Sequence, residues 1–543
     1  MGQLTVLASR FRRDPEGLVV GIAAAALAIA VVAWPLSRVT YPPMTDLPMH
    51  AAQSGALRHF LDPSFHFRDQ FELHPVAAPY FSTYVLGALF MLVMPASLAV
   101  RIAVGIALLM IPAGVAVLAW GMRKSPLLGL AAAPLVWCHV THWGFINFVS
   151  AIGLDAMAVG LALRLVDRPS RRMHVALGAC LVAVFSTHIF RFPYAVAGVL
   201  GAALFAAWGR SVSYGWSARA REIGRRASIV LLPMLPSLGL FAWFWSDRPR
   251  TLAPTPEEMA PTLDLGRIHE MVPYLVGGFR DPAELAAARV ALGVIAGVAV
   301  AALAARWGRA DASPVTDSSD RRFRRFATVA VGGNVFAMLV GYLALPIAMG
   351  AWWYIYPREI TATVVLGLAL LPDLPRIRGA RAVAVMALAG GALWFASVSA
   401  KHFEAFERRT ADFRRIITRI PKAPKLLYLV YDHSGSARTV TPWIHLPAWV
   451  QADRGGWLSF HFAAFGASPF RYRTDGGAIV APMVPERWEW EPAQFDVMRH
   501  GRGFEWFLVR SQESPAGVFG SDPEIVPVAH DGTWWLLRRN TAK

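Results

Sequence analysis

Residues 18–36, LVVGIAAAALAIAVVAWPL, form a run of nineteen residues without a charged side chain. As an α-helix rising about 1.5 Å per residue, this run is long enough to cross the ~30 Å hydrocarbon core of a bilayer. Arg10, Arg12 and Arg13 precede it, and no small-residue cleavage site follows it. We therefore expect a retained first span, with residues 1–17 as a cytoplasmic N-terminus.

Apolar runs of this kind dominate the chain. Of its 543 residues, 55% are hydrophobic and 16% are charged, whereas an average soluble protein is about 25% charged. We predict an all-α polytopic membrane domain over residues 18–399. The further candidate spans cover residues 79–98, 101–121, 126–141, 144–163, 174–190, 192–209, 228–246, 284–305, 326–348, 359–372 and 380–398.

The connections between these runs differ in charge. Residues 164–172, 207–228 and 306–325 together hold 15 basic and 5 acidic residues, and so supply more than half of the formal net charge of +17. The positive-inside rule makes these connections cytoplasmic, so the basic balance gives no evidence for nucleic acid as a partner. The loops 37–78 and 247–283 hold more acidic than basic residues, and we place them outside.

This orientation constrains the number of crossings. It puts the N-terminus inside and the region after residue 399 outside, which requires an odd number of spans, whereas the candidate runs number twelve. One pair of runs between residues 79 and 209 is therefore a single crossing, a re-entrant segment or a miscount. We prefer eleven crossings and keep thirteen as the alternative, which gives about 11 to 13 transmembrane helices.

Residues 400–543 have a different pattern. Residues 401–420 are charged and amphipathic, and Pro421 ends this segment. Short runs rich in aromatic and β-branched residues follow at 425–431, 456–462, 504–510 and 532–538. We predict a small C-terminal α/β domain on the outer side of the membrane. The Ala-, Arg- and Gly-rich composition is typical of a bacterium, so we expect the cytoplasmic membrane with this domain in the periplasm.

The first external loop begins with YPPMTDLPMH, residues 41–50. Pro48 suits the first turn of a helix, which places Thr45 or Asp46 near its N-cap. Asp46 and His50 then share one helix face. That geometry suits a carboxylate base, or a divalent metal ion held by Asp46 and His50, and the composition predicts no other cofactor. The structural alternative is that Asp46 only caps the helix.

Further cationic and imidazole side chains lie at the expected outer boundary of the membrane. His188 and Arg191 follow an apolar run, and Arg358 lies beside the aromatic turn at 352–356. Each arginine can hold a lipid phosphate through charge-assisted hydrogen bonds. The alternatives for Arg358 are an ion pair with the neighbouring Glu359, or snorkelling to ordinary lipid headgroups.

Four other polar residues are candidates for substrate contacts. Asn147 and Asp155 lie within an expected span, where a polar residue either belongs to a site or joins helices. His269 and Glu270 lie in the second external loop, where they either flank a substrate or occupy a solvated helix face.

The segment from Pro43 to His50, together with Gly144 to Phe148, is similar to segments of bacterial GT-C-like membrane proteins. The whole plan also resembles the GT-C superfamily of membrane glycosyltransferases, which includes protein mannosyltransferases, the lipid A aminoarabinose transferase and oligosaccharyltransferase. The features that this chain shares with the superfamily are one first span, a long first external loop with an Asp just after the membrane, many further spans and an external C-terminal domain. The chain has no Asp-Glu or Asp-x-Asp pair at Asp46 and no Trp-Trp-Asp signature after residue 400.

The resemblance implies an inverting glycosyltransferase that moves a sugar from a polyprenyl-phosphate donor to a lipid, glycan or protein acceptor. Asp46 would be its base, and Arg358, followed by Arg191 and His188, would stabilise the phosphate leaving group. His50 would hydrogen-bond Asp46, bind the donor phosphate or ligate a metal. Membrane lipids would be further partners. A transporter or lipid flippase, and a non-catalytic envelope assembly protein, are the alternatives, although we find no internal repeat of the kind that transporters commonly have.

Overall fold

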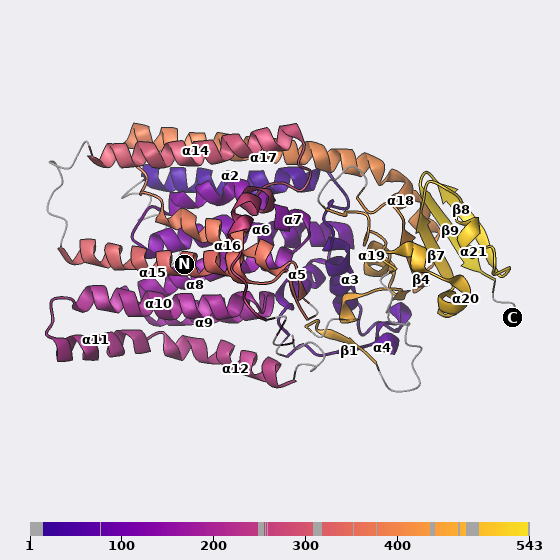
Figure 1. The fold of residues 1–543 in the computed structure, drawn as a ribbon, viewed down its shortest axis with the longest axis horizontal. Coiled ribbons are helices and arrows are strands. Elements are labelled where there is room, and N and C mark those ends of the chain that lie inside the picture. Colours follow the sequence, from indigo (N-terminus) through magenta and orange to yellow (C-terminus); the bar gives the residue numbers. More distant parts are fainter. Residues whose placement is uncertain are drawn as a thin grey trace.

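The structure is a computed structural model, and it describes residues 15–76, 78–247, 255, 257, 259–307, 318–350, 352–375, 377–434, 440–464, 467–473 and 488–540. Most of the predicted cytoplasmic N-terminus, residues 1–17, lies outside these ranges, as does the middle of the connection 306–325. The molecule is elongated, with long helices along its axis and a β-sheet at one end (Figure 1).

The long helices form one bundle. They are α2 (Pro15–Ser37), α6 (Ala96–Gly121), α8 (Ile146–Asp167), α9 (Arg171–Thr187), α10 (Arg191–Ser211), α11 (Trp216–Ser228), α12 (Leu231–Asp247), α14 (Pro282–Trp307), α15 (Ser318–Ala344), α16 (Ile355–Gly367) and α17 (Arg378–Arg409). Shorter helical segments between them are α3 (Leu47–Arg58), η1 (Pro63–Phe65), α4 (Phe67–Gln70), α5 (Ser82–Phe90), η2 (Pro126–Trp137), α7 (His139–His142), η4 (Leu265–Glu270), α13 (Met271–Leu275) and η5 (Leu368–Leu370).

Seven of the described helices are long and apolar enough to cross a membrane, namely α2, α6, α8, α10, α14, α15 and α17. The pair α11 and α12, bent by 52° at the break between them, makes an eighth if it is one span. A polytopic helical membrane fold is therefore confirmed, whereas the predicted number of 11 to 13 spans is not.

The remaining apolar runs form shorter or irregular helices. The run 79–98 contains α5, which ends at Phe90, and the start of α6, whose N-cap is Pro95, so it is not one continuous helix. The run 126–141 contains η2, a twelve-residue 3-10 helix, although such helices rarely exceed three or four residues. Pro134 inside it lacks the N–H that an α-helical bond would need. Hydropathy alone therefore overestimates how much of this region is regular α-helix.

Helices α6 and α8 are packed backbone to backbone through glycine. A Cβ atom on Gly121 would lie 2.5 Å from the carbonyl oxygen of Gly160, and a Cβ atom on Gly160 would lie 2.5 Å from that of Val117. Neither position leaves room for a side chain. Small residues at helix contacts let membrane helices approach closely, and here they fix α8, which carries residues of the candidate site.

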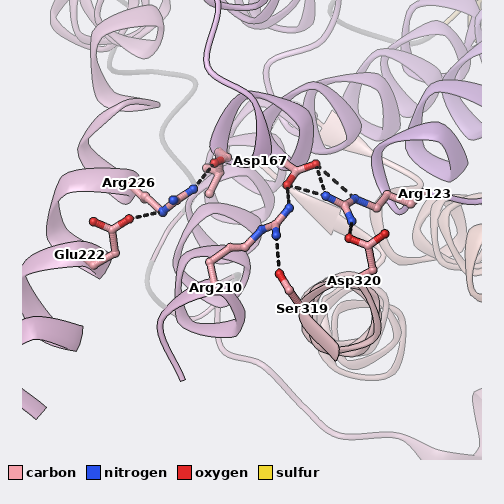
Figure 2. A network of polar contacts seen from close by, with 8 residues as sticks. Arg123, Asp167, Arg210, Glu222, Arg226, Ser319 and Asp320 are labelled. Atoms are coloured by element: carbon pink, nitrogen blue, oxygen red, sulfur yellow. Dashed lines mark hydrogen bonds and ion pairs between the residues drawn. The ribbon is translucent and has the colours of Figure 1, made fainter. Parts of the chain in front are cut away.

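The end of the bundle that lies away from the sheet is rich in arginine. Figure 1 shows α11 at this end, and Figure 2 shows the polar network beside it. Asp167 of α8 accepts hydrogen bonds from Arg123 (2.7 Å) and from Arg210 of α10. Asp320 of α15 also pairs with Arg123, and Ser319 accepts a hydrogen bond from Arg210 (2.6 Å). The buried Asp167 carboxylate thus joins α8 and α10 to the turn after α6, and the two arginines extend the network to α15.

Asp167→Asn should destabilise the bundle, because it leaves two arginines facing a site that has lost its buried charge. Removing one partner of a buried ion pair costs about 3–5 kcal/mol. The Asp320 side chain is 42% exposed, so Asp320→Asn should cost less than about 1 kcal/mol. Thermal unfolding of both variants in the same detergent checks this difference, and equal melting temperatures for the two variants would contradict it.

The C-terminal region forms a mixed five-stranded sheet in the order β5-β4-β7-β9-β8. Strand β4 (Lys425–Val430) pairs in parallel with β5 (Trp457–Leu458) and β7 (Trp506–Arg510), and β9 (Trp534–Arg539) is antiparallel to β7 and β8 (Ile525–Asp531). Its short helical segments are α18 (Ala411–Ile416), η6 (Ile417–Arg419), α19 (Ala448–Arg454), η7 (Phe462–Ala464), η8 (Pro492–Gln494), α20 (Val497–His500), η9 (Gly501–Gly503) and α21 (Ala516–Phe519).

The predicted α/β character of this region is confirmed. All four predicted strand runs contain a strand, whereas β8 was not predicted. Strand β8 lies at the edge of the sheet and is largely exposed, so its sequence lacks a clear alternation of apolar and polar residues. Helix α17 runs without a break past residue 399, where we placed the domain boundary, and leads from the bundle to α18 (Figure 1).

The loop that follows α2 packs against the C-terminal region. Strand β1 (Phe71–Leu73) pairs with β6 (Phe470–Tyr472), and a Cβ atom on Gly55 of α3 would lie 2.6 Å from the carbonyl oxygen of Ala452 in α19. Helices α3 and α19 therefore lie in close contact between the bundle and the sheet, as Figure 1 also shows. The two remaining strands, β2 (Ala348–Met349) and β3 (Trp352–Trp353), form a hairpin before α16.

Candidate functional site

Asp46 lies at the N-cap position of α3, in the loop that follows α2. Pro48 occupies the first turn of this helix, as predicted. The carboxylate, however, makes no capping hydrogen bond to the backbone, and its side chain is 20% exposed. Capping therefore does not account for this residue, because within the described part of the chain its carboxylate oxygens accept no hydrogen bond.

The loop between α7 and α8 holds the backbone of Asp46 in place. The Thr45 N–H donates to the carbonyl oxygen of His142 (3.2 Å), and the Asp46 N–H donates to that of Trp143 (3.0 Å). Gly144 has φ = +83°, and a Cβ atom on it would lie 2.6 Å from the Asp46 nitrogen. The two segments that carry the sequence resemblance, 43–50 and 144–148, are therefore in direct contact.

His50 supports this loop contact. Its Nε2 lies 3.1 Å from the Gly144 carbonyl oxygen, so it carries the proton and donates, and Nδ1 accepts from the Tyr84 hydroxyl at 3.1 Å. Burial lowers the pKa of His50 to about 4, so the ring is neutral near pH 7. Neither nitrogen is left to bind Asp46 or a metal.

The metal hypothesis does not fit these residues. Both ring nitrogens of His50 are occupied by protein partners, and the described residues contain no group of three or more His, Cys, Asp or Glu side chains arranged to hold a metal ion. We therefore derive no chemical step through a metal at Asp46.

Arg358 lies near the start of α16. Its guanidinium stacks on Phe145 at 3.8 Å from the ring centre, and Nη2 donates to the Trp353 carbonyl oxygen at 2.8 Å. Nη1 of Arg358 lies 3.5 Å from Nε2 of the buried His188. The Nε of Arg358 is buried without a hydrogen-bond partner among the described residues. No carboxylate of the described chain bonds to Arg358, so the alternative of an Arg358–Glu359 pair is wrong.

Glu359 pairs with Arg191 instead. The fully buried Arg191 donates from Nη1 to Glu359 (2.7 Å) and from Nη2 to Asp155 of α8 (2.6 Å). This triad joins α8, α10 and α16, so Asp155 has the helix-joining role that we considered for it. Both Nη groups of Arg191 are occupied by carboxylates, which distinguishes it from Arg358.

The other predicted residues lie in different surroundings. The ring of His188 is in edge contact with Tyr80 and Phe148, and its Nδ1 is buried without a partner. Asn147 is buried in the first turn of α8. Glu270 accepts a hydrogen bond from Tyr356 (3.0 Å), and the exposed His269 makes no polar contact with the other predicted residues.

One residue of the site was not predicted. His445, from the segment before α19, places Nε2 3.9 Å from Oδ1 of Asp46, and its side chain is 4% exposed. The neighbouring Thr441 N–H donates to the Thr45 hydroxyl at 3.1 Å. Residues 441–445 form no regular element and lie almost 400 positions from Asp46, so no local pattern in the sequence indicates this contact.

Burial also changes the acidity of Asp46. Loss of hydration raises the pKa of its carboxyl to about 7, and the positive charge of Arg358 opposes this rise. A base with such a pKa can take a proton from a hydroxyl and release it near neutral pH.

Comparisons with known proteins agree with the fold. No protein-family model and no curated protein matches the sequence. The crystal structure of ArnT from Cupriavidus metallidurans bound to undecaprenyl phosphate matches 95% of this chain and 97% of its own, with a TM-score of 0.53 and 13% identity. The apo structure of the same protein gives the same coverage, a TM-score of 0.54 and 12% identity. The chain thus has the fold of ArnT, one of the proteins whose plan the sequence resembles.

Proposed function

We propose that this protein is a membrane glycosyltransferase of the GT-C type, which transfers a sugar from a polyprenyl-phosphate donor to a lipid, glycan or protein acceptor. One observation carries the proposal: in the fold of ArnT, a carboxylate residue and a guanidinium residue, Asp46 and Arg358, both lie against the loop between α7 and α8, and no described group of opposite charge forms a close ion pair with either. The ArnT structure was determined with undecaprenyl phosphate, which supports a polyprenyl-phosphate carrier here.

The roles of the two side chains follow from their charges. Asp46 takes the proton from an acceptor hydroxyl as the hydroxyl oxygen bonds to the anomeric carbon. The bond from this carbon to the phosphate oxygen breaks on the opposite face, so the configuration inverts. Arg358, with His188 beside it, stabilises the negative charge that develops on the departing phosphate.

Two of the other predicted residues support this pair. His50 holds the loop at Gly144 against Asp46. Arg191 binds Glu359 and so keeps that carboxylate from neutralising Arg358. For His269 and Glu270 a substrate contact stays a prediction, since no hydrogen bond or ion pair of the described residues joins them to Asp46.

The proposed location is the cytoplasmic membrane of a bacterium, with the C-terminal region in the periplasm. The arginine-rich α11 lies at the end of the bundle opposite the sheet (Figure 1). If the positive-inside rule holds, the sheet and Asp46 are on the outer side. The acceptor would then be reached from the periplasm or from the outer leaflet.

The pH dependence of turnover tests the role of Asp46. Because the base must be ionised, kcat/KM should be half-maximal near pH 7 and should fall towards tenfold for each pH unit below it. The assay follows release of undecaprenyl phosphate from isotope-labelled undecaprenyl-phosphate sugars in the presence of bacterial membrane lipids. A rate that is constant between pH 5 and pH 8 would contradict the assignment.

A further inference from the structure

His445 reaches the candidate site from outside the helical bundle. Its Nε2 faces Oδ1 of Asp46 at 3.9 Å, which is longer than a hydrogen bond but within the range of an electrostatic contact. Hydrogen bonds in active sites are often long in the absence of substrate and shorten when it binds. The ring of His445 is stacked on Phe460 (5.5 Å between ring centres) and is in edge contact with Phe462, so its orientation is restricted.

The second nitrogen of His445 is also engaged. Nδ1 lies 3.3 Å from the hydroxyl of Tyr428, a buried residue of strand β4. Burial holds the pKa of Tyr428 well above its usual value, so the phenol keeps its proton and can donate to Nδ1. A neutral imidazole that accepts at Nδ1 carries its proton at Nε2, on the side that faces Asp46.

We propose that His445 is a positioning residue for Asp46, so that the C-terminal region completes the catalytic site rather than forming a separate partner-binding module. Tyr428 fixes the tautomer of His445, and the Nε2–H of His445 orients one oxygen of the Asp46 carboxylate. The other oxygen is then directed to the acceptor hydroxyl. The catalytic effect of His445 in this inference rests on the proposed function. The contact between His445 and Asp46 does not, and it can be tested without turnover.

The charged and titratable groups around this contact come from several elements. Arg358 of α16 acts on Asp46, Asp46 acts on Tyr84 of α5, and Tyr428 of β4 contacts His445. His50 of α3 and His433, from the segment after β4, act on His445. Burial lowers the pKa of His445 to about 3, so the ring stays neutral in the working range and acts as a hydrogen-bond donor rather than as a cation.

The first measurement follows the protonation of Asp46 itself. A hydrophobic carbodiimide reacts with protonated carboxyl groups, so mass spectrometry of the peptide containing Asp46 after labelling at pH 5 to 9 reports where this residue titrates. In the full-length protein, half-maximal labelling is expected near pH 7. His445→Phe removes the donor and should move the midpoint to higher pH, raising the labelled fraction at pH 8 several-fold.

Turnover gives the second readout. His445→Phe should lower kcat about 10- to 100-fold with little change in KM for the labelled donor, which is the usual cost of losing a group that orients a reactive side chain. His445→Gln, whose amide N–H can replace Nε2–H, should recover part of this loss. Tyr428→Phe should give an intermediate loss. His530→Phe is the matched control, since it removes an exposed imidazole of the C-terminal region, on edge strand β8, whose Nε2 contacts the Gly532 carbonyl (2.9 Å), and it should change neither readout.

The outcomes separate the inference from the proposed function. If His445→Phe leaves both the labelling midpoint and kcat unchanged, the inference is overturned whether or not Asp46 is the base. If Asp46→Asn keeps normal turnover while His445→Phe still moves the labelling midpoint, the contact stands and the proposed role of Asp46 fails. Should His445→Phe not fold, His445→Gln and Tyr428→Phe provide the test, and wild-type profiles for both would overturn the inference.

Discussion

Asp46→Asn should lower glycosyl transfer by about 10²- to 10⁴-fold, which is the usual contribution of a general base. Asparagine has the size of aspartate but cannot accept a proton at neutral pH. Because the Asp46 carboxylate makes no capping hydrogen bond, the substitution removes no bond from the fold. The melting temperature in detergent should therefore stay within about 2 °C of the wild-type value, since no described group loses a hydrogen-bond partner.

Asp69→Asn is the matched control for this experiment. Asp69 belongs to the same loop between α2 and α5, is 58% exposed and pairs with the exposed His66. Its replacement by Asn should leave transfer unchanged. Near-normal transfer by Asp46→Asn, or an equal loss in both variants, would contradict the role assigned to Asp46.

Arg358→Gln should weaken binding of undecaprenyl phosphate about 10- to 150-fold. Hydrogen bonds to a charged group contribute about 1.5–3 kcal/mol, and glutamine has neither the positive charge nor the forked donor geometry of arginine. The structure leaves the charge of Arg358 available because Glu359 is held by Arg191. Arg358→Lys should recover only part of the affinity, since an ammonium group lacks the bidentate fork.

Titration of undecaprenyl phosphate into nanodisc-embedded protein measures this loss directly. Arg408→Gln is a suitable control, because Arg408 is 67% exposed at the end of α17 and pairs with Glu404 within its own helix. An unchanged dissociation constant for Arg358→Gln would remove Arg358 from the phosphate site and favour another cation.

The sequence predicted those parts of the fold that depend on local composition. An uncharged apolar run such as 18–36 has one stable state in a membrane, and α2 begins and ends close to where hydropathy places it. The runs containing Pro95 and Pro134 were less predictable, because a proline changes the backbone without lowering the hydropathy. The number of spans depends on such segments, and for this reason it was the weakest part of the prediction.

In the candidate site, too, contacts between residues near each other in the sequence could be predicted, whereas contacts between distant residues could not. The position of Asp46 at the start of a helix followed from Pro48, two residues further along the chain. The partner of Glu359 did not follow from its neighbour Arg358, because a fully buried arginine from another helix, Arg191, takes that carboxylate. His445 could not be predicted at all, since its contact with Asp46 depends on how the C-terminal region docks on α3.

Covalent transfer of the sugar is the central claim, and proteoliposomes test it most directly. Purified protein would be incorporated with undecaprenyl phosphate carrying ¹⁴C-labelled hexoses or pentoses and with bacterial membrane lipids as acceptors. In the wild-type protein the label should move to a new covalent product, with release of undecaprenyl phosphate. In Asp46→Asn it should not. Label that crosses the bilayer still attached to undecaprenyl phosphate, equally in both proteins, would contradict this claim and indicate a transporter.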